Sequence, residues 1–170
     1  MANKPLIQIV DKNDNPVGTS SIHDAQQQGL IQQISRIMLE DDVGSVVLQR
    51  RASQKRLFPD RWDNSAAGHV DAGEDYLQAA HREMLEEVGL SNIELTEVGY
   101  FYTSFTFKDL KLNQFQKVYR AVIPYDTKFQ LERDEVSDVK WFERRELLDL
   151  LDELDSITVG LAETIKRFYT

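Results

Sequence analysis

Residues 68–90, GHVDAGEDYLQAAHREMLEEVGL, decide the fold that the sequence predicts. From Asp75 to Val88 apolar side chains recur at helical spacing, so this segment is expected to form a helix with one buried face. Gly89 is expected to end the helix, because glycine readily adopts the left-handed conformation of a helix C-terminus. The apolar face would consist of Leu77, Ala80, Met84, Leu85 and Val88.

Three glutamates lie on another face of this expected helix. Spacings of three and four residues stack Glu83, Glu86 and Glu87, and such like-charge pairs destabilise an isolated helix by a few tenths of a kcal/mol each. A bound cation would remove that cost, and carboxylate oxygens suit the hard ions Mg²⁺ and Mn²⁺. A solvated acidic helix face is the alternative interpretation.

The quoted segment resembles the Nudix box at every defined position of that family's pattern. The matching residues are Gly68, Glu74, Arg82, Glu83, Glu86, Glu87 and Gly89, with Met84 and Leu90 in the apolar places. The resemblance implies that Glu83, Glu86, Glu87 and the Gly68 carbonyl hold Mg²⁺ or Mn²⁺. It gives Glu74 and Arg82 a structural role, as an ion pair that ties the preceding loop to the helix.

The chemistry that this resemblance implies is attack of water on phosphorus, assisted by the metal. The catalytic residues would be Glu83, Glu86 and Glu87, together with a base outside the box. Glu135 is the candidate base, because the segment LERDEVSDVKWF at residues 131–142 resembles the acid-Val segment that precedes a Trp-bearing strand in relatives. An exposed loop carboxylate is the alternative for Glu135.

A local basic cluster precedes the box. It consists of Arg50, Arg51, Lys55, Arg56 and Arg61 in an otherwise acidic chain. Arg51 and Lys55 are the predicted substrate-binding residues, because arginine binds phosphate through paired hydrogen bonds and lysine acts as a point charge. A solvated basic loop is the alternative.

Residues 49–69, QRRASQKRLFPDRWDNSAAGH, resemble the corresponding region of isopentenyl diphosphate isomerases, a Nudix-fold branch that moves a double bond. In those isomerases a cysteine before the Gly-His pair acts as acid and base, but here that position is Ala67. The isomerases also bind a metal through histidines, for which His23 and His69 would be the counterparts, although for His69 a supporting role beside the metal or a loop role is favoured. The intact box favours the isomerase-like hydrolase branch.

The mixture of strands and helices in the remaining chain predicts an α/β fold with a mixed central sheet in one domain spanning residues 1–170, and the resemblance implies that it is a Nudix-type α/β/α sandwich. A strand is expected at residues 7–11, with a turn at 11–18 that reverses it into a hairpin, and a helical turn is expected at 21–28. Further strands are expected at 31–39, 46–48, 65–70, 98–107, 115–124 and 139–142, and C-terminal helices at 144–154 and 159–168.

Composition narrows the classes of partner. The net charge of -9 gives no general footprint for a nucleic acid polymer, so the expected partner is a small-molecule diphosphate met by local positive charge. The chain has no cysteine and no apolar segment of membrane-spanning length, and the N-terminal apolar run Leu6 to Val10 is too short for a signal peptide. A cytoplasmic protein is expected, and a homodimer only by analogy.

Three functions therefore compete. The leading hypothesis is a magnesium-dependent pyrophosphohydrolase, which cleaves a phosphoanhydride bond in a nucleoside diphosphate linked to another group or in a related diphosphate. The second is isoprenoid isomerisation, which Ala67 disfavours. The third is a sensor that binds a diphosphate without cutting it, because a fold alone does not guarantee turnover.

Overall fold

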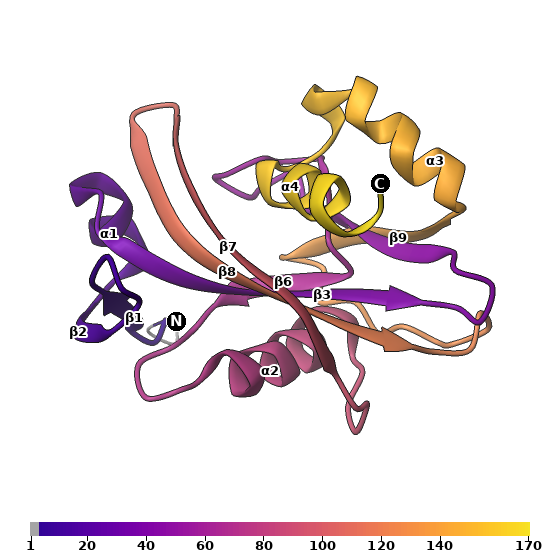
Figure 1. Ribbon diagram of the computed structural model, residues 1–170, viewed down its shortest axis with the longest axis horizontal. Helices are drawn as coiled ribbons and strands as arrows, with labels where there is room; N and C mark the ends of the chain where they lie inside the picture. Colours follow the sequence, from indigo (N-terminus) through magenta and orange to yellow (C-terminus); the bar gives the residue numbers. More distant parts are fainter. Residues whose placement is uncertain (1–3) are drawn as a thin grey trace.

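The computed structural model describes residues 4–170, which form a mixed sheet covered by helices on both faces (Figure 1). Its central strand is β3, Ile31–Glu40. The whole of β3 pairs in parallel with β8, and its opposite edge is shared by β1, β6 and β4, all antiparallel. The remaining strands extend the sheet through β1–β2, β7–β8, β4–β5 and β4–β9 pairs.

The other elements follow the chain in this order. The strands are β1 (Ile7–Val10), β2 (Pro16–Ser20), β4 (Val46–Arg51), β5 (Trp62–Asp63), β6 (Ala66–His69), β7 (Thr96–Phe107), β8 (Leu110–Val122) and β9 (Val136–Phe142). The helices are α1 (Ile22–Gln28), α2 (Tyr76–Val88), α3 (Arg144–Asp149) and α4 (Val159–Phe168), with two short 3-10 turns, η1 (Leu150–Asp152) and η2 (Leu154–Ser156).

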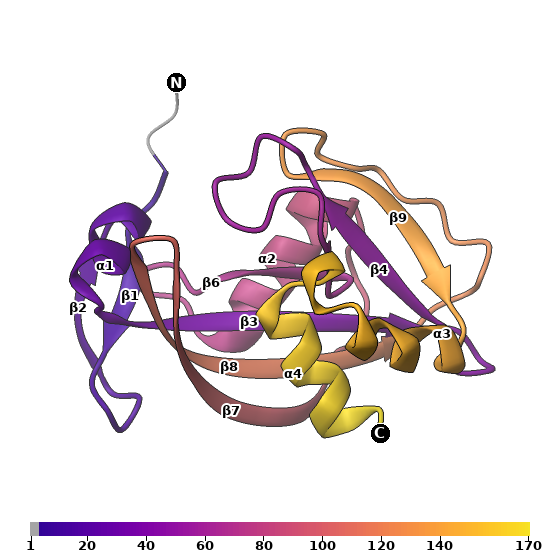
Figure 2. The same ribbon diagram turned by 90° about the horizontal axis from the view of Figure 1, so that it is seen from above.

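Two apolar layers hold the helices against the sheet. Alternation along β3 sends Ile37 and Leu39 toward α2, where they pack with Ala80 and Met84. Met38 faces the other way, into a second cluster that contains residues of α3 and α4 such as Leu161. Figures 1 and 2 show α2 on one face and α3 with α4 on the other, so the expected α/β/α sandwich with a mixed sheet is confirmed.

The helix that decides the fold begins and ends as predicted. Asp75 accepts a hydrogen bond from the Gln78 backbone and completes a capping box, and Gly89 ends α2 with φ +75°. Its buried face differs from the prediction. Ala80, Met84 and Val88 are buried, but Leu77 and Leu85 are exposed, Leu85 by 53%. Glu87 is buried in their place, because its side chain points toward β4 and β6 rather than into solvent.

The C-terminal part contains one wrong boundary. The helix expected over residues 144–154 ends at Asp149, and two 3-10 turns follow, so that the chain can enter α4 after the bridge between Trp62 and Ile157. The helix at 159–168 is confirmed, with Thr158 as its N-cap. Across residues 4–170 no helix is both long and apolar enough to cross a membrane.

Candidate active site

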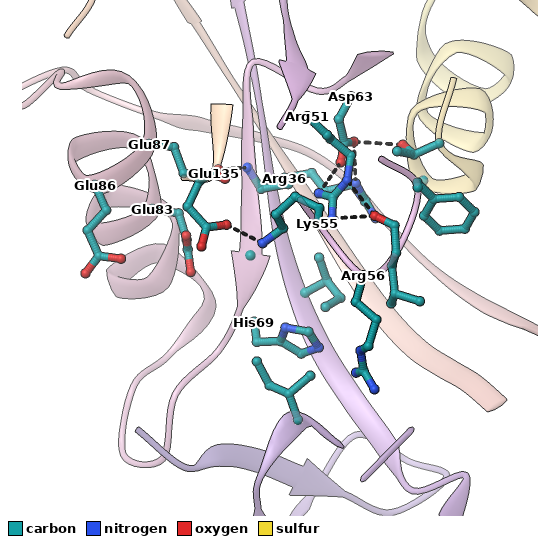
Figure 3. Close-up of a pocket in the computed structure, with 18 of the residues that line it drawn as sticks. Arg36, Arg51, Lys55, Arg56, Asp63, His69, Glu83, Glu86, Glu87 and Glu135 are labelled. Atoms are coloured by element: carbon teal, nitrogen blue, oxygen red, sulfur yellow. Dashed lines mark hydrogen bonds and ion pairs between the residues drawn. The ribbon is translucent and has the colours of Figure 1, made fainter. Parts of the chain in front are cut away.

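A cavity of about 800 Å³ lies between α2, β6 and the loops that follow β4 and precede β9. Its volume is in the usual range for a small-molecule site. Figure 3 shows acidic side chains of α2 on one side and basic side chains on the other. Every predicted site residue lines it except Glu74 and Gly89; the lining set includes Arg51, Lys55, Gly68, Arg82, Glu83, Glu86, Glu87 and Glu135.

Glu87 is the most buried of the three glutamates, with 5% of its surface exposed. Its Oε1 atom accepts hydrogen bonds from the Ala67 backbone N–H at 2.8 Å and from Gln49 Nε2 at 3.1 Å. Burial, reinforced by the charge of Glu83, raises the pKa of Glu87 to about 8. Both donors serve one oxygen, so Oε2 has no hydrogen-bond donor from the described residues.

Glu83 lies against Gly68, and this contact explains the glycine. A Cβ atom at position 68 would lie 2.1 Å from the Glu83 carboxylate, far inside van der Waals contact. Arg82 donates to Glu83 at 2.7 Å. Burial nevertheless raises the pKa of Glu83 to about 7, against the opposing charge of Arg82. The glycine thus leaves room for a carboxylate beside the β6 backbone.

The predicted ion pair between Glu74 and Arg82 is present. Arg82 donates to the two Glu74 oxygens at 2.7 and 2.9 Å, and to the His69 carbonyl at 2.9 Å. This guanidinium therefore joins three segments: the loop before α2, the helix itself and the end of β6. Glu86 is 3.3 Å from the same arginine, but its side chain is 58% exposed.

The donors around Glu83 and Glu87 fit a hard divalent cation. Within residues 4–170 no three His, Asp or Glu side chains are arranged to hold an ion as they stand, and Arg82 contacts both Glu83 and Glu86. Burial raises the pKa values of Glu83 and Glu87, and among the described residues only Glu83 of the two has a cationic partner, Arg82. Gln49 Oε1, beside Glu87, is the one buried side-chain acceptor of the described residues without a partner. Oxygen donors that need positive charge are suitable ligands for Mg²⁺ or Mn²⁺.

The basic wall comes from the end of β4, at Arg51, and from the loop that follows it, at Lys55. Arg51 donates through Nε and Nη2 to the Leu57 carbonyl, at 3.0 and 2.9 Å, which folds this loop around the guanidinium. Lys55 forms an ion pair with Glu135, so the predicted phosphate-binding lysine contacts the predicted base. Figure 3 shows this pair between the helix and Arg51.

The two histidines that were compared with isomerase metal ligands contact different residues. His69 lies in the cavity wall and contacts Gln32 at 2.8 Å, while His23 contacts Arg56 at 2.9 Å. Burial, followed by the charge of Lys55, lowers the pKa of His69 to about 3. His69 is the last residue of β6, and its favoured role, beside the metal site or in a loop, stays a prediction.

The comparisons with known proteins agree with this geometry. The family model described as the NUDIX domain matches residues 32–166. The chain belongs to the Nudix family. It is a hydrolase of that family, whose members act on pyrophosphate bonds and generally use a divalent metal such as Mg²⁺.

Relatives of this Nudix hydrolase carry different names. The uncharacterized Nudix hydrolase YfcD of Escherichia coli K12 is 30% identical over 169 residues, covering 98% of this chain and 90% of YfcD. Isopentenyl-diphosphate Delta-isomerase 2 of Photorhabdus laumondii is 31% identical over 153 residues, covering 89% and 85%. The crystal structure of DR0079 from Deinococcus radiodurans has a TM-score of 0.79 at 24% identity, covering 97% and 99%, and shows the shared fold.

The Nudix site also contains two residues that the sequence reasoning missed. Arg36 on β3 and Asp63 on β5 are buried at the basic end of the cavity, 3.1 Å apart. Asn64 also accepts a hydrogen bond from Arg36, at 2.9 Å. The available signal was a single arginine inside the apolar run at residues 34–39, because a charge in a buried strand requires a buried partner.

Proposed function

We propose that this Nudix hydrolase is a magnesium-dependent pyrophosphohydrolase, which cleaves a phosphoanhydride bond in a nucleoside diphosphate linked to another group or in a related small-molecule diphosphate. The observation that supports it is the division of one cavity into an acidic wall on α2 and a basic wall at Arg51 and Lys55. A diphosphate with a divalent cation carries both kinds of charge, so it can meet both walls.

The acidic wall is the proposed cation site. Glu83, Glu86, Glu87 and the Gly68 carbonyl would hold Mg²⁺ or Mn²⁺. When bound, the ion neutralises charge on phosphate oxygens and lowers the pKa of a bound water. The Glu74–Arg82 ion pair holds the loop before α2 and the end of β6 in place around these donors.

The basic wall and Glu135 perform the remaining steps in this proposal. Arg51 and Lys55 bind the phosphate oxygens, and their position fixes the phosphorus relative to the acidic wall. Glu135 accepts the proton of the attacking water while the bond from phosphorus to the bridging oxygen breaks. A proton acceptor is needed within hydrogen-bond reach, and Glu135 lines the same cavity.

A hydrolysis screen tests the proposal. The chain is incubated with nucleoside, sugar and lipid diphosphates in the presence of Mg²⁺ or Mn²⁺, and products are identified by mass spectrometry. We expect release of phosphate or a monophosphate, abolished in Glu87→Gln and retained in the control Glu94→Gln, which changes an exposed glutamate beyond the helix. A chain inactive on every diphosphate but able to bind one would instead be a sensor.

A second candidate function is double-bond isomerisation, which the name of the Photorhabdus laumondii relative favours. The residue at the position of the isomerase cysteine argues against it. Ala67 has no exchangeable side-chain proton, and its backbone N–H is held by Glu87 at 2.8 Å. Incubation of isopentenyl diphosphate in deuterated water tests it, because isomerisation incorporates deuterium and hydrolysis does not.

A further inference from the structure

Asp63 lies between two arginines at the basic end of the cavity. It is 4% exposed, and its two oxygens have separate partners. Oδ1 accepts hydrogen bonds from Arg36 at 3.1 Å, from the Asn64 backbone at 2.8 Å and from the Thr158 hydroxyl at 2.8 Å. Oδ2 faces Arg51 Nη1 at 3.4 Å. The carboxylate is therefore anchored on one side and available to Arg51 on the other.

Arg51 is held from two directions. The Leu57 carbonyl accepts from Nε and Nη2, and Asp63 accepts from Nη1. A guanidinium has five N–H groups, so these three contacts leave about two terminal N–H groups for a ligand. Because a long side chain loses conformational entropy when it binds, an arginine that is already fixed binds phosphate at lower cost.

The anchoring of Asp63 also has a defined origin. Arg36 is buried under α4, and the space that it occupies exists because residue 160 is a glycine. Thr158, the N-cap of α4, contributes its hydroxyl to the same Asp63 oxygen. Asp63 is thus fixed by the core of the sheet and by α4, rather than by the loop that follows Arg51.

We propose that Asp63 is a positioning residue for substrate binding, which holds the Arg51 guanidinium in the orientation that binds a phosphate group. This inference rests on the proposed function, in which Arg51 contacts the diphosphate. Asp63 itself touches no substrate in this proposal. Its carboxylate also separates two cations, so its charge, and not only its shape, is required for Arg51 to stay in place.

Calorimetric titration with methylenediphosphonate, a diphosphate analogue that is not hydrolysed at its bridge, tests the inference in the presence of Mg²⁺. Wild type, Asp63→Asn, Arg51→Gln and the double variant form a double-mutant cycle. We expect Asp63→Asn to raise the Kd about tenfold, and to change it less than about twofold when Arg51 is already replaced. Asp60→Asn, which removes an exposed carboxylate from the loop between β4 and β5, is the matched control and keeps the wild-type Kd.

The two single effects would be independent if Asp63 only stabilised the fold. Additive effects in the cycle, an unchanged Kd in Asp63→Asn, or a wild type that does not bind the diphosphonate would each overturn the inference. Thermal unfolding of the same samples identifies any unfolded variant, in which case Asp63→Glu replaces Asp63→Asn and must show the same coupling to Arg51. A wild type that binds the diphosphonate but hydrolyses no diphosphate would contradict the proposed function and support the positioning role if coupling is found.

Discussion

Replacing Gly160 by alanine is expected to disturb the buried arginine beneath α4. A Cβ atom at this position would lie 1.9 Å from Arg36 Nη2 and 2.0 Å from Cζ. The guanidinium is buried and donates to Asp63 at 3.1 Å and to Asn64 at 2.9 Å, so moving it away from the new Cβ atom breaks these contacts. Either the guanidinium leaves these partners or α4 moves away from the sheet.

The magnitude follows from the interactions that must break. Separating a buried arginine from its carboxylate partner costs about 3–5 kcal/mol. Alanine recovers about 0.5–1 kcal/mol relative to glycine inside a helix. The free energy of unfolding of Gly160→Ala should therefore fall by about 2–4.5 kcal/mol. Movement of α4 would instead expose apolar residues such as Leu161, which is also destabilising.

Urea unfolding followed by tryptophan fluorescence measures this change, since the chain contains two tryptophans. Gly18→Ala is the matched control: Gly18 has no positive φ, and a Cβ atom added there would meet no atom within 4 Å, so a change below about 0.5 kcal/mol is expected. Equal unfolding free energies for the two variants, with equal urea dependence, would refute the packing of Arg36 against Gly160.

Three further predictions concern the acidic wall. Gly68→Ala should displace the Glu83 carboxylate and weaken Mn²⁺ binding about tenfold or more, as measured by electron paramagnetic resonance. Mn²⁺ affinity should rise with pH through about 7 to about 8 and then level off, because burial raises the pKa values of Glu83 and Glu87 and the ion binds only their deprotonated forms; pH-independent binding would exclude this. Glu74→Gln should lower kcat/KM by only about tenfold, because Arg82 keeps three other carboxylate partners. Glu87→Gln should lower kcat/KM by at least about 100-fold. A kinetic assay that found the larger loss in Glu74→Gln would contradict the roles assigned to the two glutamates.

Local signals predicted the elements of the fold better than their partners. Asp75 and Gly89 mark the two ends of α2, and these ends were predictable because helix capping depends on residues that are close together in sequence. Strand pairing has no such signal. β3 pairs with β8, about 80 residues later, and periodicity cannot select that partner over another apolar strand.

The site residues that belong to the sequence motif were predicted, whereas those that depend on burial in the folded chain were missed. Glu83 and Glu87 line the cavity as expected, but the apolar pattern wrongly gave Leu85 a buried position and left Glu87 on a polar face. An amphipathic pattern assigns faces by polarity, and a buried carboxylate violates that rule. Arg36 and Asp63 were missed because their pairing joins β3 to β5 through tertiary contact alone.

The ion pair between Lys55 and Glu135 connects the two proposed roles of the basic wall. In the proposal Lys55 binds a phosphate group and Glu135 accepts a proton, and neither can act fully while the two remain paired. A phosphate group that draws Lys55 away breaks its ion pair with Glu135 and leaves the Glu135 carboxylate free to contact the attacking water. Substrate binding and activation of the base would then be one event, because the same lysine serves both.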